Sequence, residues 1–172
     1  MKRLVIAIII ILGFQYADAQ VGKDSTTKMK DSIPAYERNP TIPSFSIEAA
    51  PDSSAFTNHD LKHKKPLIIV IFSPDCDHCK HFTKELLAKY DMVKHAQIVM
   101  VSALNYNMIK KFYDDYKIAD YPSIKMGRDT NYTLGNFMGV RMFPTLIVYD
   151  KHGNFLKRLD TGITVEKIAE LL

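Results

Sequence analysis

Apolar and polar residues follow one another along the chain in blocks that predict alternating strands and helices. A continuous apolar run rich in β-branched residues at 67–72 is typical of a central strand covered on both faces, and residues 98–104, apolar except for Ser102, predict a second buried strand. Each run is followed by apolar residues at helical spacing, over residues 80–90 and 108–116. This order predicts parallel strands joined by helices.

Shorter elements are predicted on both sides of this unit. Residues 43–48 alternate between apolar and polar side chains, which predicts a short edge strand, and residues 58–66 are expected to form a helical turn or loop. The second half of the chain is predicted to contain an extended piece at 121–126, a short helix at 134–140, a strand at 144–149, a hairpin turn at 150–154, a partner strand at 155–159 and a closing helix at 165–172. The predicted fold class is α/β, with a central mixed β-sheet flanked by helices.

The first residues have the pattern of a secretory signal peptide. Lys2 and Arg3 precede an apolar run over residues 4–14, and Ala17-Asp18-Ala19 matches a cleavage site. The run is shorter than the roughly 20 apolar residues of a membrane span. We therefore expect a signal peptide at 1–19, a flexible lead-in at 20–41 and one domain at 42–172. The protein is predicted to be exported, periplasmic or otherwise extracytoplasmic, and membrane-bound only if the signal is not cleaved.

Composition narrows the class of protein. The chain has 172 residues, 47% of them hydrophobic, and a formal net charge of +4. This is the composition of one globular domain whose core needs neither a disulfide nor a structural metal. The basic residues are not concentrated in one block, so nucleic acid is not expected as a partner. We expect a monomer.

The two cysteines of the chain, Cys76 and Cys79, lie three residues apart where a predicted strand passes into a predicted helix. A disulfide across so short a loop removes little chain entropy, so the pair is interpreted as reactive rather than structural. The N-terminus of a helix carries partial positive charge, which stabilises a thiolate on Cys76 and makes it the nucleophile. Cys79, one turn on, is placed to resolve a mixed disulfide on Cys76.

Three charged neighbours act on these thiols in opposite directions. A cationic His78 favours the thiolate, whereas the carboxylates of Asp75 and Asp77 disfavour it. The direction in which the pair transfers electrons is therefore left open by these residues alone.

Metal binding is the main alternative for such a motif. A structural Zn²⁺ needs four ligands, and beyond the two cysteines and His78 only His81 is nearby. Two thiolates with a His or Met suit Cu(I), so a copper carrier remains an alternative, although the distant His152 falls in a predicted turn. Met138 and Met142 are predicted as core residues rather than ligands. We predict no metal site.

The combination of motifs resembles the thioredoxin superfamily. An apolar strand leads into the CxxC motif, a βαβ segment follows, and a Phe-Pro-Thr motif at 143–145 opens a later strand before a Lys-x-Gly hairpin. Over residues 42–172 this is similar to the exported TlpA/ResA-like branch, with a βαβ insertion between the CxxC and the cis-proline strand. The resemblance implies a redox-active Cys76–Cys79 disulfide with no other cofactor. It also implies a cis bond at Pro144 and pairing of the Phe143 backbone with a substrate strand.

The chain also departs from these relatives. Val70 and Phe82 occupy positions where members of the superfamily carry acids, so no general base is assigned to Cys79. Asp75 replaces the usual Trp, and Phe143 replaces the usual Thr or Val.

The predicted function is that of an exported thiol-disulfide oxidoreductase that exchanges disulfides with protein substrates and is recycled by a redox partner. A reductant role is favoured by the resemblance. A DsbA-like disulfide donor and a Cu(I)-binding metallochaperone are the alternatives.

Overall fold

The computed structural model describes residues 33–172, so the predicted signal peptide and most of the predicted lead-in lie outside the described residues. The helices and strands follow the predicted order closely. They are α2 (Ala35–Arg38), β1 (Ser46–Ala49), β2 (Ser54–Thr57), β3 (Leu67–Ile71), α3 (Asp77–Ala88), β4 (Gln97–Ser102), α4 (Tyr106–Asp115), β5 (Ile124–Arg128), α5 (Thr133–Met138), β6 (Thr145–Tyr149), β7 (Phe155–Leu159) and α6 (Val165–Ala169), with short 3-10 turns at Asn58–Asp60, Tyr90–Met92 and Ile118–Asp120.

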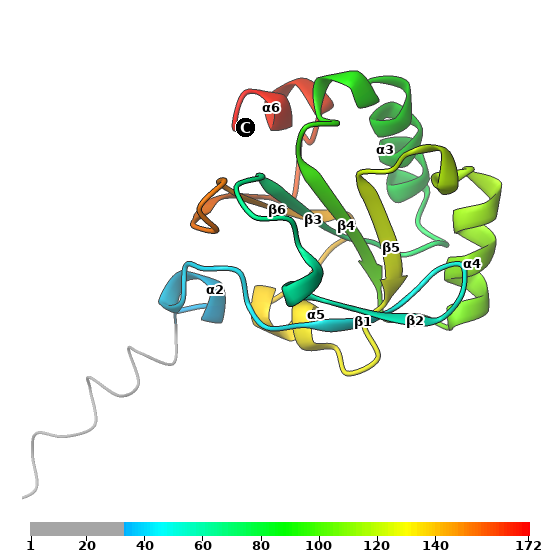
Figure 1. The fold of residues 1–172 in the computed structure, drawn as a ribbon, viewed down its shortest axis with the longest axis horizontal. Coiled ribbons are helices and arrows are strands. Elements are labelled where there is room, and N and C mark those ends of the chain that lie inside the picture. The colour runs from blue at the N-terminus through cyan, green and yellow to red at the C-terminus, as the bar shows by residue number, and fades with distance from the viewer. Residues whose placement is uncertain (1–32) are drawn as a thin grey trace, which may run out of the picture. The chain divides into compact units, whose positions relative to one another are not determined.

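One mixed sheet contains all seven strands, in the order β2-β1-β5-β4-β3-β6-β7 (Figure 1). The three central strands β3, β4 and β5 run parallel, because a helix connects each to the next. β6 pairs antiparallel with β3, and β7 returns beside β6 as a hairpin. The predicted α/β class with a mixed central sheet is confirmed.

β3 shows how the pleat of a strand divides the core between two faces. Every residue of this strand is buried. Ile68 and Val70 belong to a cluster that also contains Cys79 and buried residues of α3, α4 and α6, whereas Ile69 and Ile71 pack with residues of α2 and α5. Successive side chains of a strand point to opposite faces, so helices on both sides are required to cover an apolar run of this kind.

A strand was predicted at 43–48 and is present as β1, but the prediction that it lies at the edge of the sheet is wrong. β1 lies between β5 and β2, and β2 is the edge strand. The sequence analysis did not predict β2, because its side chains are exposed or only partly buried and give no alternating apolar pattern. The turn between the two strands is closed by the Ser53 N–H, which donates to the Ala49 carbonyl over 2.8 Å.

Regular structure also occurs before residue 42, within the segment that was predicted as a flexible lead-in. α2 buries Tyr36, whose ring centroid lies 5.4 Å from that of Phe155. Thr41 forms a β-bridge with Asn154. A single aromatic residue anchors an otherwise polar segment, and such an anchor leaves no periodic signal in the sequence.

No helix within residues 33–172 combines the length and the apolar character that a membrane span requires.

Candidate active site

The turn between β3 and α3 places Cys76 at the start of a helix, as predicted. Cys76 is the N-cap of α3; its N–H donates to the Ser73 carbonyl over 3.1 Å, and its carbonyl accepts the Lys80 N–H over 3.0 Å. The side chain is half-buried. Its sulfur therefore lies where the unpaired N–H groups of the first turn favour negative charge.

Cys79 lies one turn further along α3 in a different environment. Its side chain is only 1% exposed and packs in the core cluster below α3. Burial raises the pKa of the Cys79 thiol to about 12, and the neighbouring Cys76 contributes to the rise. Both cysteines are free thiols in this structure. The geometry thus separates an accessible thiol from a buried, protonated one.

The charged residues of the active-site loop are all at the surface. Asp75, Asp77 and His78 are exposed. The Asp77 carboxylate accepts a hydrogen bond from the Lys80 Nζ over 3.0 Å, which lowers the pKa of Asp77 and partly balances its charge. The opposing effects expected of these residues therefore act through solvent rather than through direct contact in the core.

Phe143 and Pro144 lie directly against the first cysteine. The Phe143-Pro144 peptide bond is cis, as the resemblance implied. The Cys76 Sγ donates to the Phe143 carbonyl at 3.6 Å. Within residues 33–172 the Phe143 N–H donates to no other group. The Phe143 carbonyl therefore lies against the reactive sulfur and the Phe143 N–H is left without a protein partner in this part of the chain, and an unpaired main-chain donor is a group that an added strand can use.

The backbone before this cis bond is held by hydrogen bonds that the sequence analysis missed. The Thr145 hydroxyl donates to the Met142 carbonyl over 2.9 Å and contacts the Asp160 carboxylate at 2.7 Å. Because a hydroxyl has one proton, these two contacts share it or alternate. Either way, the first residue of β6 ties the loop to the end of β7.

Arg158 extends this network to the end of α5. Its guanidinium group binds the Asp160 carboxylate at 2.7 and 2.9 Å and also donates to the carbonyls of Met138 and Gly139. The guanidinium lowers the pKa of the Asp160 carboxyl and keeps it ionised. In the sequence, this network shows only as two opposite charges, Arg158 and Asp160, two residues apart at the end of β7. Such a pair is common on any exposed strand.

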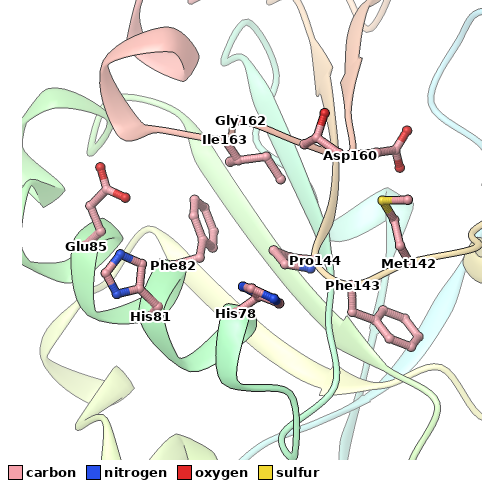
Figure 2. Close-up of a pocket in the computed structure, with 11 residues that line it drawn as sticks. His78, His81, Phe82, Glu85, Met142, Phe143, Pro144, Asp160, Gly162 and Ile163 are labelled. Atoms are coloured by element: carbon pink, nitrogen blue, oxygen red, sulfur yellow. The ribbon is translucent and has the colours of Figure 1, made fainter.

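A groove of about 450 Å³ runs beside the reactive end of α3 (Figure 2). Along one side it is bounded by α3 and along the other by the loop after β7, and residues 142–144 close one end. The lining residues are His78, His81, Phe82, Glu85, Met142, Phe143, Pro144, Asp160, Thr161, Gly162 and Ile163. The groove therefore joins the predicted loop residue His78 to the predicted substrate residues Phe143 and Pro144.

Acidic groups are absent from the two positions singled out in the sequence. Val70 and Phe82 are buried in the same apolar cluster as Cys79. Glu85 lines the groove, but its carboxylate forms an ion pair with Lys89 at 2.9 Å.

The methionines divide between core and surface. Met138 is fully buried, as predicted, but Met142 is 46% exposed, so its assignment to the core is wrong. The cause is its position in the loop before the cis-proline, where its carbonyl rather than its side chain is held. Over residues 33–172 no three His, Cys, Asp or Glu side chains come close enough together to hold a metal ion.

A buried strand that ends in a helix-capping CxxC, beside a cis-proline loop, is the arrangement of a thioredoxin fold. A family model described as a thioredoxin-like domain matches residues 54–172. The chain belongs to this family. No match to the sequence was found among curated proteins.

Solved structures share the fold at low sequence identity. A DsbF homologue from Corynebacterium diphtheriae is 17% identical with a TM-score of 0.62, over 76% of this chain and 83% of its own. The thioredoxin domain of a thiol-disulfide oxidoreductase from Bacteroides vulgatus is 17% identical with a TM-score of 0.61, over 76% and 94%. StoA from Bacillus subtilis is 17% identical with a TM-score of 0.55, over 77% and 98%.

Proposed function

We propose that this protein is an exported thiol-disulfide oxidoreductase that exchanges disulfides with protein substrates. The observation that carries the proposal is the position of the half-buried Cys76 sulfur, 3.6 Å from the Phe143 carbonyl, with buried Cys79 one helical turn away. A substrate strand that pairs with the Phe143 backbone brings its own sulfur to Cys76.

The exchange proceeds in two displacements. The Cys76 thiolate attacks a substrate disulfide, forms a Cys76–substrate disulfide and releases the other substrate sulfur as a thiolate. The Cys79 thiolate then attacks the Cys76 sulfur, so that the Cys76–Cys79 disulfide forms and the second substrate sulfur leaves. The substrate gains two electrons and the pair loses two. No cofactor other than this disulfide takes part, and a separate redox partner returns the pair to the dithiol.

The favoured direction is reduction of the substrate. The TlpA/ResA-like arrangement supports it, as do the carboxylates of Asp75 and Asp77, which oppose a thiolate on Cys76. The opposite direction, disulfide donation, is favoured by His78, which lines the groove. The reduction potential of the pair distinguishes the two. A value near that of thioredoxin, about −270 mV, identifies a reductant, and one near that of DsbA, about −120 mV, identifies a donor.

An extracytoplasmic location follows from the signal-peptide pattern at residues 1–19. Structural neighbours include an exposed lipoprotein thioredoxin from Streptococcus pneumoniae and a secreted disulfide oxidoreductase from Mycobacterium tuberculosis. In this proposal the protein is a monomer that is attached to the membrane only if its signal is retained.

Trapping of substrates tests the proposal. In the Cys79→Ala variant the second displacement is removed, so protein substrates should accumulate as disulfides with Cys76 that a reductant releases. The Cys76→Ala variant is the matched control and should trap nothing. If Cys79→Ala traps no protein from the extracytoplasmic fraction, while a small thiol reagent shows that Cys76 is accessible, the proposal is wrong.

A further inference from the structure

A second cavity, of about 180 Å³, adjoins the active site next to Phe143. Phe143 lines both this cavity and the groove beside α3. Its ring points away from the α3 side chains that line the groove (Figure 2). The second cavity is lined by Ile71, Val101, Ser102, Ala103, Asp129, Tyr132, Gly135, Asn136, Val140 and Phe143. It therefore lies at the carboxyl ends of β3 and β4, against α5, and we call it the α5 cavity.

The one carboxylate of the α5 cavity is already fully used. Asp129 is buried and accepts N–H groups from Thr133 at 2.9 Å, Leu134 at 2.8 Å and Gly135 at 3.4 Å. These bonds satisfy the free N–H groups of the first turn of α5. The carboxylate thus stabilises the helix that forms the wall, and it has little capacity left for a cationic ligand.

The remaining surface of the cavity is mainly apolar. Ile71 and Val101 are buried and form its inner part. At the rim, Tyr132 is 58% exposed and Phe143 is 45% exposed. Exposed aromatic side chains around a mainly apolar recess are typical of a surface that binds an apolar group.

A substrate strand that paired with the Phe143 backbone would pass beside both the α5 cavity and the groove, because Phe143 lines both. Successive side chains of a strand leave it on opposite faces. If a substrate strand pairs with the Phe143 backbone and its cysteine points to Cys76, the adjacent residue points away from Cys76. Phe143 belongs to both cavities, so that adjacent side chain reaches the one on the side of α5.

We propose that the α5 cavity binds the apolar side chain next to the substrate cysteine and so selects among protein substrates. This inference rests on the proposed disulfide exchange and adds a substrate class to it. The preferred substrate has a neutral apolar residue, such as Leu, adjacent to the reactive cysteine. A residue with a charged side chain is disfavoured because burial of its charge in a mainly apolar cavity, whose one carboxylate is already bonded, is costly.

Two positions allow the cavity to be filled from different elements. A Cβ placed on Gly135 would meet no atom within 4 Å, so a side chain can be added there without a clash at the first carbon. Ala103, after β4, lines the same cavity. The variants Gly135→Leu and Ala103→Leu therefore reduce the space from the α5 side and from the β4 side. Ala119→Leu is the matched control, because Ala119 is exposed and does not line the cavity.

The experiment uses the Cys79→Ala protein and short peptides whose cysteine forms a disulfide with 2-mercaptoethanol. The Cys76 thiolate attacks the peptide sulfur, the mixed disulfide with the peptide forms, and 2-mercaptoethanol leaves as its thiolate. Three peptides differ only in the residue next to the cysteine, which is Leu, Gly or Asp. Each rate is divided by the rate at which free glutathione displaces 2-mercaptoethanol from the same peptide, which corrects for its intrinsic reactivity.

The Leu peptide should be trapped about tenfold faster than the Gly or Asp peptide. Gly135→Leu and Ala103→Leu should each reduce this preference to less than about twofold, whereas Ala119→Leu should leave it unchanged. Equal rates for the three peptides, or a preference that survives both filled variants, would overturn the inference but leave the exchange proposal standing. Absence of any trapped peptide would overturn both.

Discussion

The two sides of the candidate active site are held in place in different ways. The thiol segment (residues 73–79) continues from β3 into α3, and its shape is set by main-chain hydrogen bonds between residues close in sequence. The proline segment (residues 139–145) has main-chain bonds of this kind only at its start, where the N–H groups of Gly139 and Val140 donate to the end of α5. Its position depends on Thr145, Asp160 and Arg158, through bonds that span 15 to 20 residues. The reactive group is thus specified locally, whereas the surface that presents a substrate to it is specified by the adjacent hairpin.

The largest expected effect concerns the buried thiol of the thiol segment. Below its pKa of about 12, the thiolate fraction of Cys79 rises tenfold for each pH unit. Displacement of a substrate from Cys76 by Cys79 should therefore become about a hundredfold faster between pH 7 and pH 9. A rapid pH jump of a preformed mixed disulfide, followed by quenching with acid and mass spectrometry, measures this rate.

The Cys79→Ala variant supplies the control for that measurement. It reports how the first displacement, by Cys76, depends on pH, and any spontaneous loss of the mixed disulfide over the same range. A release rate that is already constant at neutral pH would contradict a strongly protonated Cys79. Another group near Cys79 would then have to act as its base, because Val70 and Phe82, which replace the acids of relatives, are apolar and buried.

The second effect tests whether the hairpin positions the proline segment. Asp160→Asn keeps the shape of the side chain but removes the charge bound by Arg158 and weakens the contact with Thr145. Exchange with protein substrates should become about tenfold slower, because the Phe143 backbone is held less precisely. Exchange with dithiothreitol, which needs no strand pairing, should change little. Stability should fall by about 1–2 kcal/mol in urea unfolding at pH 7.

The pH dependence of this stability loss has a defined sign. Arg158 lowers the pKa of Asp160 in the folded protein, so the contribution of the carboxylate is complete above its ordinary pKa of about 4. It is lost as the pH falls through the lower folded value. The difference between wild type and Asp160→Asn should therefore shrink below about pH 4.

Asp150→Asn is the matched variant at the other end of the same hairpin. Asp150 accepts N–H groups from His152 and Asn154, so its replacement should also reduce stability. Since Asp150 lies at the turn away from the proline segment, protein exchange should remain unchanged. An equal loss of exchange in both variants would show that general destabilisation, not positioning, explains the result.

The same contrast explains what the sequence could and could not predict. The helix start at Cys76 and the burial of β3 follow from a short motif and an apolar run, the cis bond before Pro144 was implied by the family resemblance, and all three are confirmed. The bond between Thr145 and Asp160 joins the start of β6 to the residue after β7, its neighbour in the hairpin, and leaves no periodic pattern. β2 and α2 were missed for a related reason, because an exposed strand and a helix with one buried aromatic lack a repeating apolar face.

A smaller effect is expected from the side chain of the proline segment itself. Phe143 is 45% exposed and lines both cavities, so Phe143→Ala should change the stability by less than about 0.5 kcal/mol. Exchange with protein substrates should slow by about fivefold, the loss of one aromatic contact, while exchange with dithiothreitol is unaffected.

Met142→Ala provides the comparison for Phe143→Ala. Met142 is equally exposed and adjacent, but it lines only the groove beside α3. The preference for a Leu peptide over a Gly peptide should therefore persist in Met142→Ala and weaken in Phe143→Ala. If Met142→Ala alters the preference more than Phe143→Ala does, the side chain next to the substrate cysteine binds in the groove and not in the α5 cavity.

The smallest expected effect concerns α5, the helix that leads into the proline segment. Gly135 and Gly139 both have open space where a Cβ would lie, but only Gly139 has a positive φ, of 60°, at the end of the helix. Gly135→Ala should therefore raise the stability by about 0.5–1 kcal/mol, because Ala loses less backbone entropy within a helix. Gly139→Ala should lower it by about 1 kcal/mol, because its left-handed conformation penalises a Cβ. Urea unfolding measures the free energy of unfolding of each variant relative to wild type. The same Gly→Ala change should raise this free energy at residue 135 and lower it at residue 139. If both variants are destabilised alike, the backbone at Gly135 is not that of an ordinary helical turn. Strain within α5, and not only the bonds from the hairpin, would then contribute to the position of the proline segment.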